Sequence, residues 1–143
     1  IAGVCVGNGD GCVVVFFCWQ VFCYSPAMSQ LIYKLVPKAL WREAEAARVF
    51  TGAPVDTADG FIHFSTASQA RETAAKHFAG QDNLLIAAID GGKLGEALRY
   101  EPSRGGALFP HLYGPLSLDN VVWVKPLPLG ADGGHVFPQL EQE

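Results

Sequence analysis

A motif at residues 59–66 combines one histidine with two hydroxyl side chains. It reads Asp-Gly-Phe-Ile-His-Phe-Ser-Thr. Alternation along a strand places His63 on the face opposite Ile62, and Ser65 and Thr66 follow where we expect a helix to begin. The N-terminus of a helix offers free backbone N–H groups and a partial positive charge, which suit phosphate or carboxylate. We therefore expect His63, Ser65 and Thr66 to bind a ligand. The alternative is that the hydroxyls only cap the helix and the histidine is structural.

A second motif, at residues 109–115, reads Phe-Pro-His-Leu-Tyr-Gly-Pro. Its two prolines stiffen the segment and restrict the directions in which His111 and Tyr113 point. Rigidly held loops often carry binding or catalytic residues. We expect His111 to transfer a proton and Tyr113 to stack on a ligand or orient it. The alternative is an aromatic plug that closes the core, with His111 at its polar edge.

The segment between the motifs, residues 98–106, contributes a carboxylate and a guanidinium. Glu101 is suited to act as a general base or to accept a ribose hydroxyl. Arg104 precedes two glycines, a combination that suits an anion. Here the alternative is a surface ion pair followed by a flexible turn. We expect His63 and His111 to line one concavity, with Glu101 or Arg104 at its rim.

Several common site patterns are missing from the sequence. There is no H-E-x-x-H motif and no phosphate-binding G-x-x-x-x-G-K-[ST] motif. The cysteines have no zinc-site spacing. We therefore assign no metal ligands. The catalytic candidates are His111 and Glu101.

The elements that must position these residues follow from periodicity and from proline and glycine signals. Their order, two strand–helix units followed by several strands, favours an α+β fold over a doubly wound sheet. The expected strands are 31–36, 61–64, 84–89, 98–101 and 121–124, the two main helices are 38–50 and 66–79, and the loops are 51–60, 102–117 and the tail after 126.

The first 27 residues differ from the rest and hold all four cysteines. Their apolar run, residues 12–24, is shorter than the roughly 20 residues of a membrane-spanning helix. Three explanations of this lead stay open. It is translated upstream sequence with Met28 as the true start, a signal or anchor segment, or a genuine pair of strands. We divide the chain into an extraneous lead, 1–27, and one α+β domain, 28–143. The domain has no cysteine, which favours a cytoplasmic location.

The composition and net charge limit the classes of partner that the protein can bind. The net charge is −4 and charged residues make up 17% of the chain, without a lysine or arginine cluster. A protein that binds duplex nucleic acid needs a basic face, so we exclude that class of partner. We expect no membrane partner. A small-molecule ligand remains compatible with the sequence.

Both motifs, together with the strand at 31–34 and the segment 101–106, resemble a bacterial family known as domain of unknown function 952. The resemblance covers nearly all of residues 30–125. It implies a fold similar to ADP-ribosyltransferases and RNA 2′-phosphotransferases, in which small, bent, mixed or antiparallel sheets surround a cleft for NAD or a related nucleotide. It also implies that His63 contacts the ribose and that Glu101 orients a nucleophile. Two functions stay open: a transferase acting on a nucleotide or ADP-ribose-like ligand, and a non-catalytic module that binds such a ligand in the same cleft.

Overall fold

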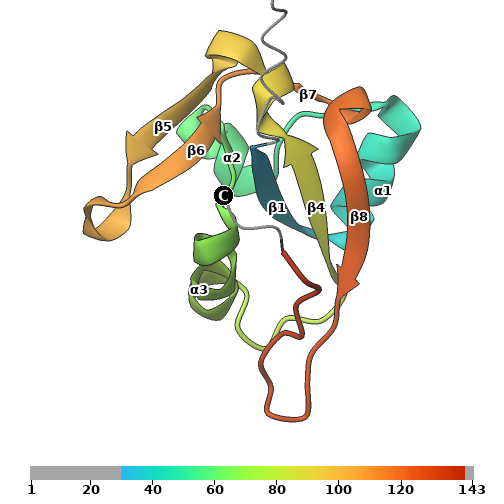
Figure 1. Cartoon of the computed structure of the whole chain (residues 1–143). Coiled ribbons are helices and arrows are strands. Elements are labelled where there is room, and N and C mark those ends of the chain that lie inside the picture. Colours follow the sequence, from blue (N-terminus) through green and yellow to red (C-terminus); the bar gives the residue numbers. More distant parts are fainter. Residues whose placement is uncertain (1–29, 141–143) are drawn as a thin grey trace, which may run out of the picture.

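The computed structural model describes residues 30–140. Within that range it contains three α-helices and eight strands, joined by short 3-10 turns and loops (Figure 1). The helices are α1 (Lys38–Ala47), α2 (Pro54–Asp59) and α3 (Ala67–His77). The strands are β1 (Leu31–Pro37), β2 (Val49–Phe50), β3 (Ile62–His63), β4 (Leu84–Asp90), β5 (Leu98–Pro102), β6 (Leu108–Leu112), β7 (Leu116–Ser117) and β8 (Val121–Leu127).

The strands form three small sheets, ordered β1–β4–β8, β2–β7 and β3–β6–β5. Every pairing in them is antiparallel. Two helices of ten and eleven residues pack against the larger sheet, and α2 adds one short helix of six residues. The expectation of an α+β fold with small sheets is therefore confirmed.

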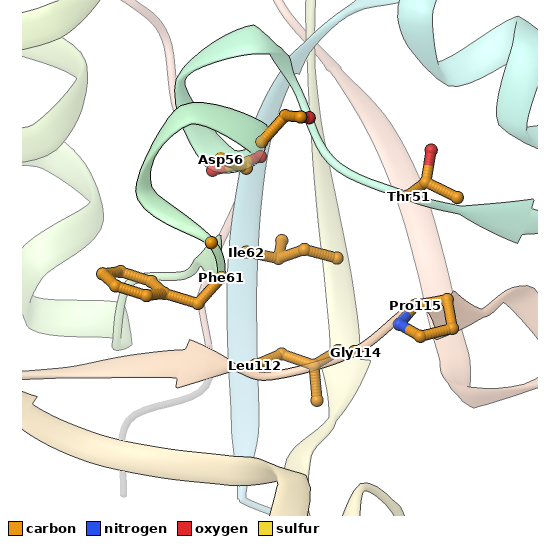
Figure 2. Close-up of a pocket in the computed structure, with 9 residues that line it drawn as sticks. Thr51, Asp56, Phe61, Ile62, Leu112, Gly114 and Pro115 are labelled. Carbon is orange, nitrogen blue, oxygen red and sulfur yellow. The ribbon is translucent and has the colours of Figure 1, made fainter.

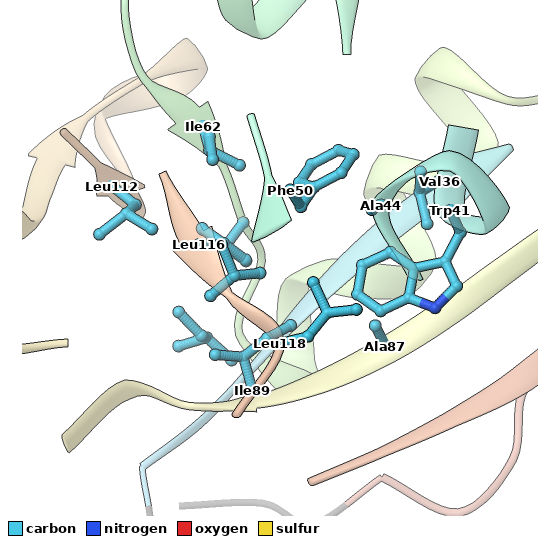
Figure 3. Close-up of a cluster of buried hydrophobic side chains, with 12 residues drawn as sticks. Val36, Trp41, Ala44, Phe50, Ile62, Ala87, Ile89, Leu112, Leu116 and Leu118 are labelled. Atoms are coloured by element: carbon cyan, nitrogen blue, oxygen red, sulfur yellow. The ribbon is translucent and has the colours of Figure 1, made fainter. Parts of the chain in front are cut away.

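In the β1–β4–β8 sheet, β1 and β4 are buried on both faces, whereas most residues of the edge strand β8 are partly or fully exposed. On one face, Trp41 and Ala44 of α1 pack with Phe50, Ile89 and other apolar residues (Figure 3). On the other face, Ala74 of α3 and residues of the C-terminal segment cover the sheet. Strands buried on both sides read as continuous apolar runs, as the sequences of β1 and β4 do.

The β3–β6–β5 sheet packs one of its faces against the apolar core. Ile62 of β3 and Leu112 of β6 belong to the same core cluster as α1, and Leu98 of β5 packs against it. Backbone hydrogen bonds of 2.8 Å in both directions between Tyr33 and Ser65 tie the end of this sheet to β1. Because alternate side chains face opposite ways, the second face of β3–β6–β5 can carry a site.

The first expected helix, 38–50, ends earlier than its pattern predicts. Arg48 adopts φ 60°, a left-handed conformation that stops α1 after Ala47. The last two predicted helical residues form β2 instead and pair with β7. The tertiary partner thus overrides local helix propensity at this end.

Two segments predicted as loops contain regular structure, and those predictions were wrong. The segment 51–60 contains α2, which Pro54 opens at its first turn and Asp56 caps by accepting from the Ala53 N–H. The segment 102–117 contains β6 and β7. Pro110 lies in the central strand, but its missing N–H falls beyond the end of the two-residue β3, so little of the ladder is lost.

Candidate functional site

One face of the β3–β6–β5 sheet gathers charged and aromatic side chains in a row. His63 on β3 lies directly opposite His111 on β6, and His111 lies opposite Arg99 on β5. The neighbouring residues Ile62 and Leu112 belong to the core on the other face. The strand period of two therefore separates a packing face from a polar face within the same three strands.

His63 is held between two aspartates. Its Nδ1 lies 2.6 Å from Oδ1 of Asp56, and its Nε2 lies 3.0 Å from Oδ2 of Asp59. The backbone N–H of His63 also donates to Asp56 Oδ1 at 3.1 Å. Asp56 is buried, whereas the side chain of Asp59 is half exposed. The ring is therefore fixed on its inner side by a rigid carboxylate and on its outer side by a surface carboxylate.

Asp56 is neutralised by Lys34, a buried lysine from β1. The Lys34 Nζ donates to both carboxylate oxygens of Asp56, at 2.8 and 3.1 Å, and to the backbone carbonyl of His63 at 2.9 Å. Burial opposes ionisation of Asp56, but the hydrogen bond from His63 and the charge of Lys34 outweigh it and hold the pKa of Asp56 well below its ordinary value. Burial lowers the pKa of Lys34, against the attraction of Asp56. An unpaired charge in this position would be costly, so the two groups depend on each other.

Glu101 collects two hydrogen bonds on one oxygen. The Tyr113 hydroxyl donates to Oε1 at 2.6 Å, and the His111 Nδ1 lies 3.1 Å from the same atom. The bond from Tyr113 and then that from His111 lower the pKa of Glu101, and in return Glu101 raises the pKa of Tyr113. The Arg99 guanidinium lies 5.0 Å from the centre of the Tyr113 ring. Glu101 is therefore an ionised acceptor placed beside a buried imidazole.

Phe61 joins the two histidines and the tyrosine into one cluster. Its ring centroid lies 4.2 Å from that of His111 in a stacked arrangement, 4.8 Å from His63 and 5.2 Å from Tyr113. The centroids of His63 and His111 lie 5.3 Å apart. The two histidines therefore lie side by side, and Glu101 adjoins His111. That they line one concavity stays a prediction.

A hollow of about 380 Å³ opens next to this cluster, between α2 and the segment that follows β6 (Figure 2). Both sequence motifs line it, and Phe61 is the residue that it shares with the ring cluster. His63 and His111 do not line it, so the two histidines adjoin the hollow rather than face into it. The lining residues are Thr51, Asp56, Thr57, Gly60, Phe61, Ile62, Leu112, Gly114 and Pro115.

Ser65 and Thr66 already have structural partners. The hydroxyl of Ser65 is buried and lies 3.0 Å from the hydroxyl of Thr73. Thr66 is the N-cap of α3, its hydroxyl lies 3.1 Å from that of Ser68, and its backbone N–H donates to the Gln69 side chain at 3.1 Å. The bond from the Thr66 N–H to the Gln69 side chain is one half of a capping box.

Arg104 begins the turn Arg104–Gly106 at the tip of the β5–β6 hairpin, where Gly105 has φ 77°. The last ladder pair before this turn joins Pro102 to Leu108, whereas His111 lies farther along β6. The backbone of Arg104 is thus set apart from the histidine row. The arginine that lies in this row is Arg99, opposite His111.

Two other properties bear on the class of protein. Among residues 30–140, no group of three or more histidine, cysteine, aspartate or glutamate side chains is placed to hold a metal ion. Over the same residues, no helix is long and apolar enough to span a bilayer.

Comparisons with known proteins identify the family. The family model described as "Protein of unknown function (DUF952)" matches residues 35–124. The chain belongs to this family. The crystal structure of protein CC0527 from Caulobacter crescentus is 52% identical, with a TM-score of 0.72, and the match covers 74% of this chain and 93% of that chain. The solution NMR structure of CC0527 is also 52% identical, with a TM-score of 0.68, over 73% of this chain and 90% of that chain. No curated protein matched the chain.

The DUF952 match contains almost the whole cluster. Every residue from Asp56 to Tyr113 lies inside the matched range, and Lys34 lies one residue before it. Apart from Lys34, the cluster therefore lies within the matched part of the chain.

Sequence reasoning missed the residues behind His63. Lys34 was read only as part of a strand, Asp56 as part of a loop, and Phe61 was given no role. A single lysine in the apolar run of β1 was the available signal, because a strand buried on both faces can hold a lysine only with a partner.

Proposed function

We propose that this DUF952 protein binds a ribose-bearing, phosphorylated small molecule, such as NAD, ADP-ribose or a mononucleotide, where the two motifs meet. The observation that carries the proposal is the pair of imidazole–carboxylate units on one sheet face, whose rings lie 5.3 Å apart. A carboxylate on one ring nitrogen orients the imidazole. In His63 the other nitrogen contacts Asp59, so a ligand oxygen reaches it only by displacing that carboxylate. Two such units side by side are suited to contact neighbouring oxygens of a sugar.

The proton-transfer roles in this proposal fall to His111 and Glu101. A transferase would break a bond at the ribose anomeric carbon and pass the ribosyl group to an acceptor, which loses a proton. Glu101 has a lowered pKa, so it suits hydrogen bonding to a ribose hydroxyl better than accepting a full proton. His111 is then the better carrier of the acceptor's proton, with Glu101 holding its ring in place and the Tyr113 hydroxyl donating to Glu101.

The remaining ligand groups have matching neighbours. Phe61 and the hollow beside it offer a largely apolar surface of suitable size for a flat ring. Arg99 provides a cation next to Tyr113, and Arg104 remains the proposed phosphate contact from the hairpin tip. Ser65 and Thr66 remain candidates for ligand binding, and their present hydrogen bonds would have to change for their hydroxyls to reach a ligand. An ADP-ribosyltransferase-like fold is part of the proposal, supported by the small antiparallel sheets that meet at the cluster.

A second candidate is a module that binds the same ligand without turnover. It is favoured by one observation: both ring nitrogens of His63 are engaged by aspartates. A histidine whose two nitrogens are both engaged is poorly placed to carry a proton in catalysis, which favours binding without turnover. The two candidates share the ligand and differ only in whether bonds are broken.

Binding is tested by thermal unfolding of the full chain with NAD, ADP-ribose and AMP at millimolar concentration. A ligand present at about 100 times its dissociation constant stabilises the native state by roughly 2.7 kcal/mol, which raises the midpoint by several degrees. We expect at least one ligand to do so, and we expect His63→Ala to abolish the shift while unfolding stays cooperative. The absence of a shift with all three ligands would overturn the proposal.

Turnover is tested by incubating the protein with NAD and separating the products by chromatography. A transferase releases nicotinamide, and Glu101→Gln should slow this release by at least about 100-fold, because it removes the carboxylate that orients His111, the proton carrier. The matched control is Glu45→Gln, an exposed glutamate on α1, which should leave the rate unchanged. A ligand-induced midpoint shift without any release would select the binding module.

A further inference from the structure

The two aspartates that flank His63 differ in how firmly they are held. Asp56 is buried and accepts from Lys34, from the Ala53 N–H and from His63 itself. Asp59 is half exposed, and within residues 30–140 its side chain has one polar contact, the Nε2 of His63 at 3.0 Å. Exposed ion pairs contribute little to stability, so the outer contact is easily exchanged while the inner one is fixed.

Asp59 also has no local reason to be acidic. It is the last residue of α2, at the end where a helix favours positive rather than negative groups. The turn that follows is made by Gly60, with φ 86°, and by a backbone hydrogen bond from Gly60 to Asp56. Neither feature uses the Asp59 side chain, so its visible role is the contact with His63.

The geometry sets a condition on hydrogen bonding at His63, because each ring nitrogen faces a carboxylate oxygen. A carboxylate oxygen accepts hydrogen bonds and cannot donate them. The two ring nitrogens can therefore be bonded to Asp56 and Asp59 together only when both carry a proton. In that state, Lys34 balances Asp56 and the imidazolium balances Asp59.

We propose that the Asp59 carboxylate occupies the place of an anionic ligand oxygen, and that a phosphate group displaces it to accept the Nε2–H of His63. Once Asp59 moves away, the positive charge of the ring is left without its outer partner and attracts an anion. Arg99 lies in the same row beyond His111 and adds a second positive charge. The ligand class follows from the proposed function, whereas the site for its oxygen follows from His63 and Asp59.

The experiment uses inorganic phosphate as the probe and the full chain labelled with ¹⁵N. Phosphate is titrated at about pH 6 while the side-chain ¹⁵N signals of His63 are followed. In Asp59→Asn, the half-saturating phosphate concentration should fall about tenfold, since a competitor and a repelling charge are both removed. The matched control is Asp82→Asn, an equal change at an exposed aspartate, which should stay within about twofold of the wild type.

Two results would overturn the inference: Asp59→Asn and Asp82→Asn binding phosphate alike, or the perturbed nitrogen being Nδ1 rather than Nε2. Failure of this inference can be told apart from failure of the proposed function. Tighter phosphate binding at His63 without any nucleotide binding supports the anion contact and removes the nucleotide function. Nucleotide binding that Asp59→Asn leaves unchanged removes the anion contact and keeps the function.

Discussion

The β1–β4–β8 and β3–β6–β5 sheets share the same strand geometry but differ in the side chains that their faces carry. The first is apolar on both faces, with Ile32 and Ile89 in one cluster and Tyr33 and Ile86 in the other. The second is apolar on one face and carries histidine, glutamate and arginine on the other. The first sheet is a scaffold stabilised by burial, and the second is a thin platform that presents titratable groups.

Lys34 connects the two regions. It belongs to β1, on the same strand face as Ile32 and Val36, yet its ammonium bonds Asp56 and the backbone of His63. A buried ion pair adds little net stability compared with apolar packing, but breaking one is expensive. The scaffold therefore holds the platform's histidine through a contact that tolerates few substitutions. The following experiments test this difference between the sheets.

The largest expected effect comes from Lys34→Met, which keeps much of the side-chain volume and removes the charge. Asp56 is then left buried and uncompensated, so the free energy of unfolding should fall by about 3–5 kcal/mol in a denaturant titration. The matched control is Lys38→Met, an exposed lysine at the start of α1, where a change below about 0.5 kcal/mol is expected. Equal losses in the two variants would show that the ion pair does not link the sheets.

A truncation of the same kind on each sheet gives the next largest difference. Ile86→Ala removes a side chain that is 0% exposed and should cost about 2–5 kcal/mol. Leu108→Ala removes one that is 52% exposed at the start of β6 and should cost less than about 1 kcal/mol. Denaturant midpoints of the two variants at matched slopes measure both values. A large loss from Leu108→Ala would mean that the platform is also stabilised mainly by burial.

The smallest expected effect is the loss of stability as the pH becomes acidic. The pKa of Asp56 is lowered from its ordinary value of 3.8, so between its two values the unfolded chain binds more protons than the native one. Its stabilising contribution is complete above pH 3.8 and is lost as the pH falls toward the native pKa. The expected loss approaches about 1.4 kcal/mol per pH unit. Asp56→Asn should be less stable than the wild type at neutral pH, and its free energy of unfolding, measured by denaturant titration at several pH values, should fall less steeply toward acid. Parallel dependence on pH in the two proteins would contradict this role of Asp56.

Local patterns predicted the central scaffold well. The apolar runs that form β1 and β4, and the Thr66–Gln69 signature that opens α3, each specify their element by composition. The predictions failed where short elements exist only through partners. β6 carries Pro110 and still forms, because β5 pairs along its whole length. α2 has only six residues, too few for periodicity to reveal it.

The sequence predicted the histidines of the candidate site but not the residues that hold them in place. The alternation around Ile62 was enough to place His63 on the face opposite the core, and the two motifs lie side by side. The partner of Lys34 lies 22 residues away, in a segment without a strong local pattern. No spacing rule links two residues at that distance, since the contact exists only after β1 and α2 have packed together.

The sequence by itself determined the α+β class, the apolar strands and the presence of two motifs rich in histidine and aromatic residues, because these depend on side-chain period and residue type. Only the tertiary structure decided which carboxylate meets which imidazole. It placed Asp56 and Asp59 on opposite sides of His63 and Glu101 beside His111. The reason is physical: hydrogen bonds act over about 3 Å, and positions at that precision are set by the packing of whole sheets and helices rather than by neighbours in the chain.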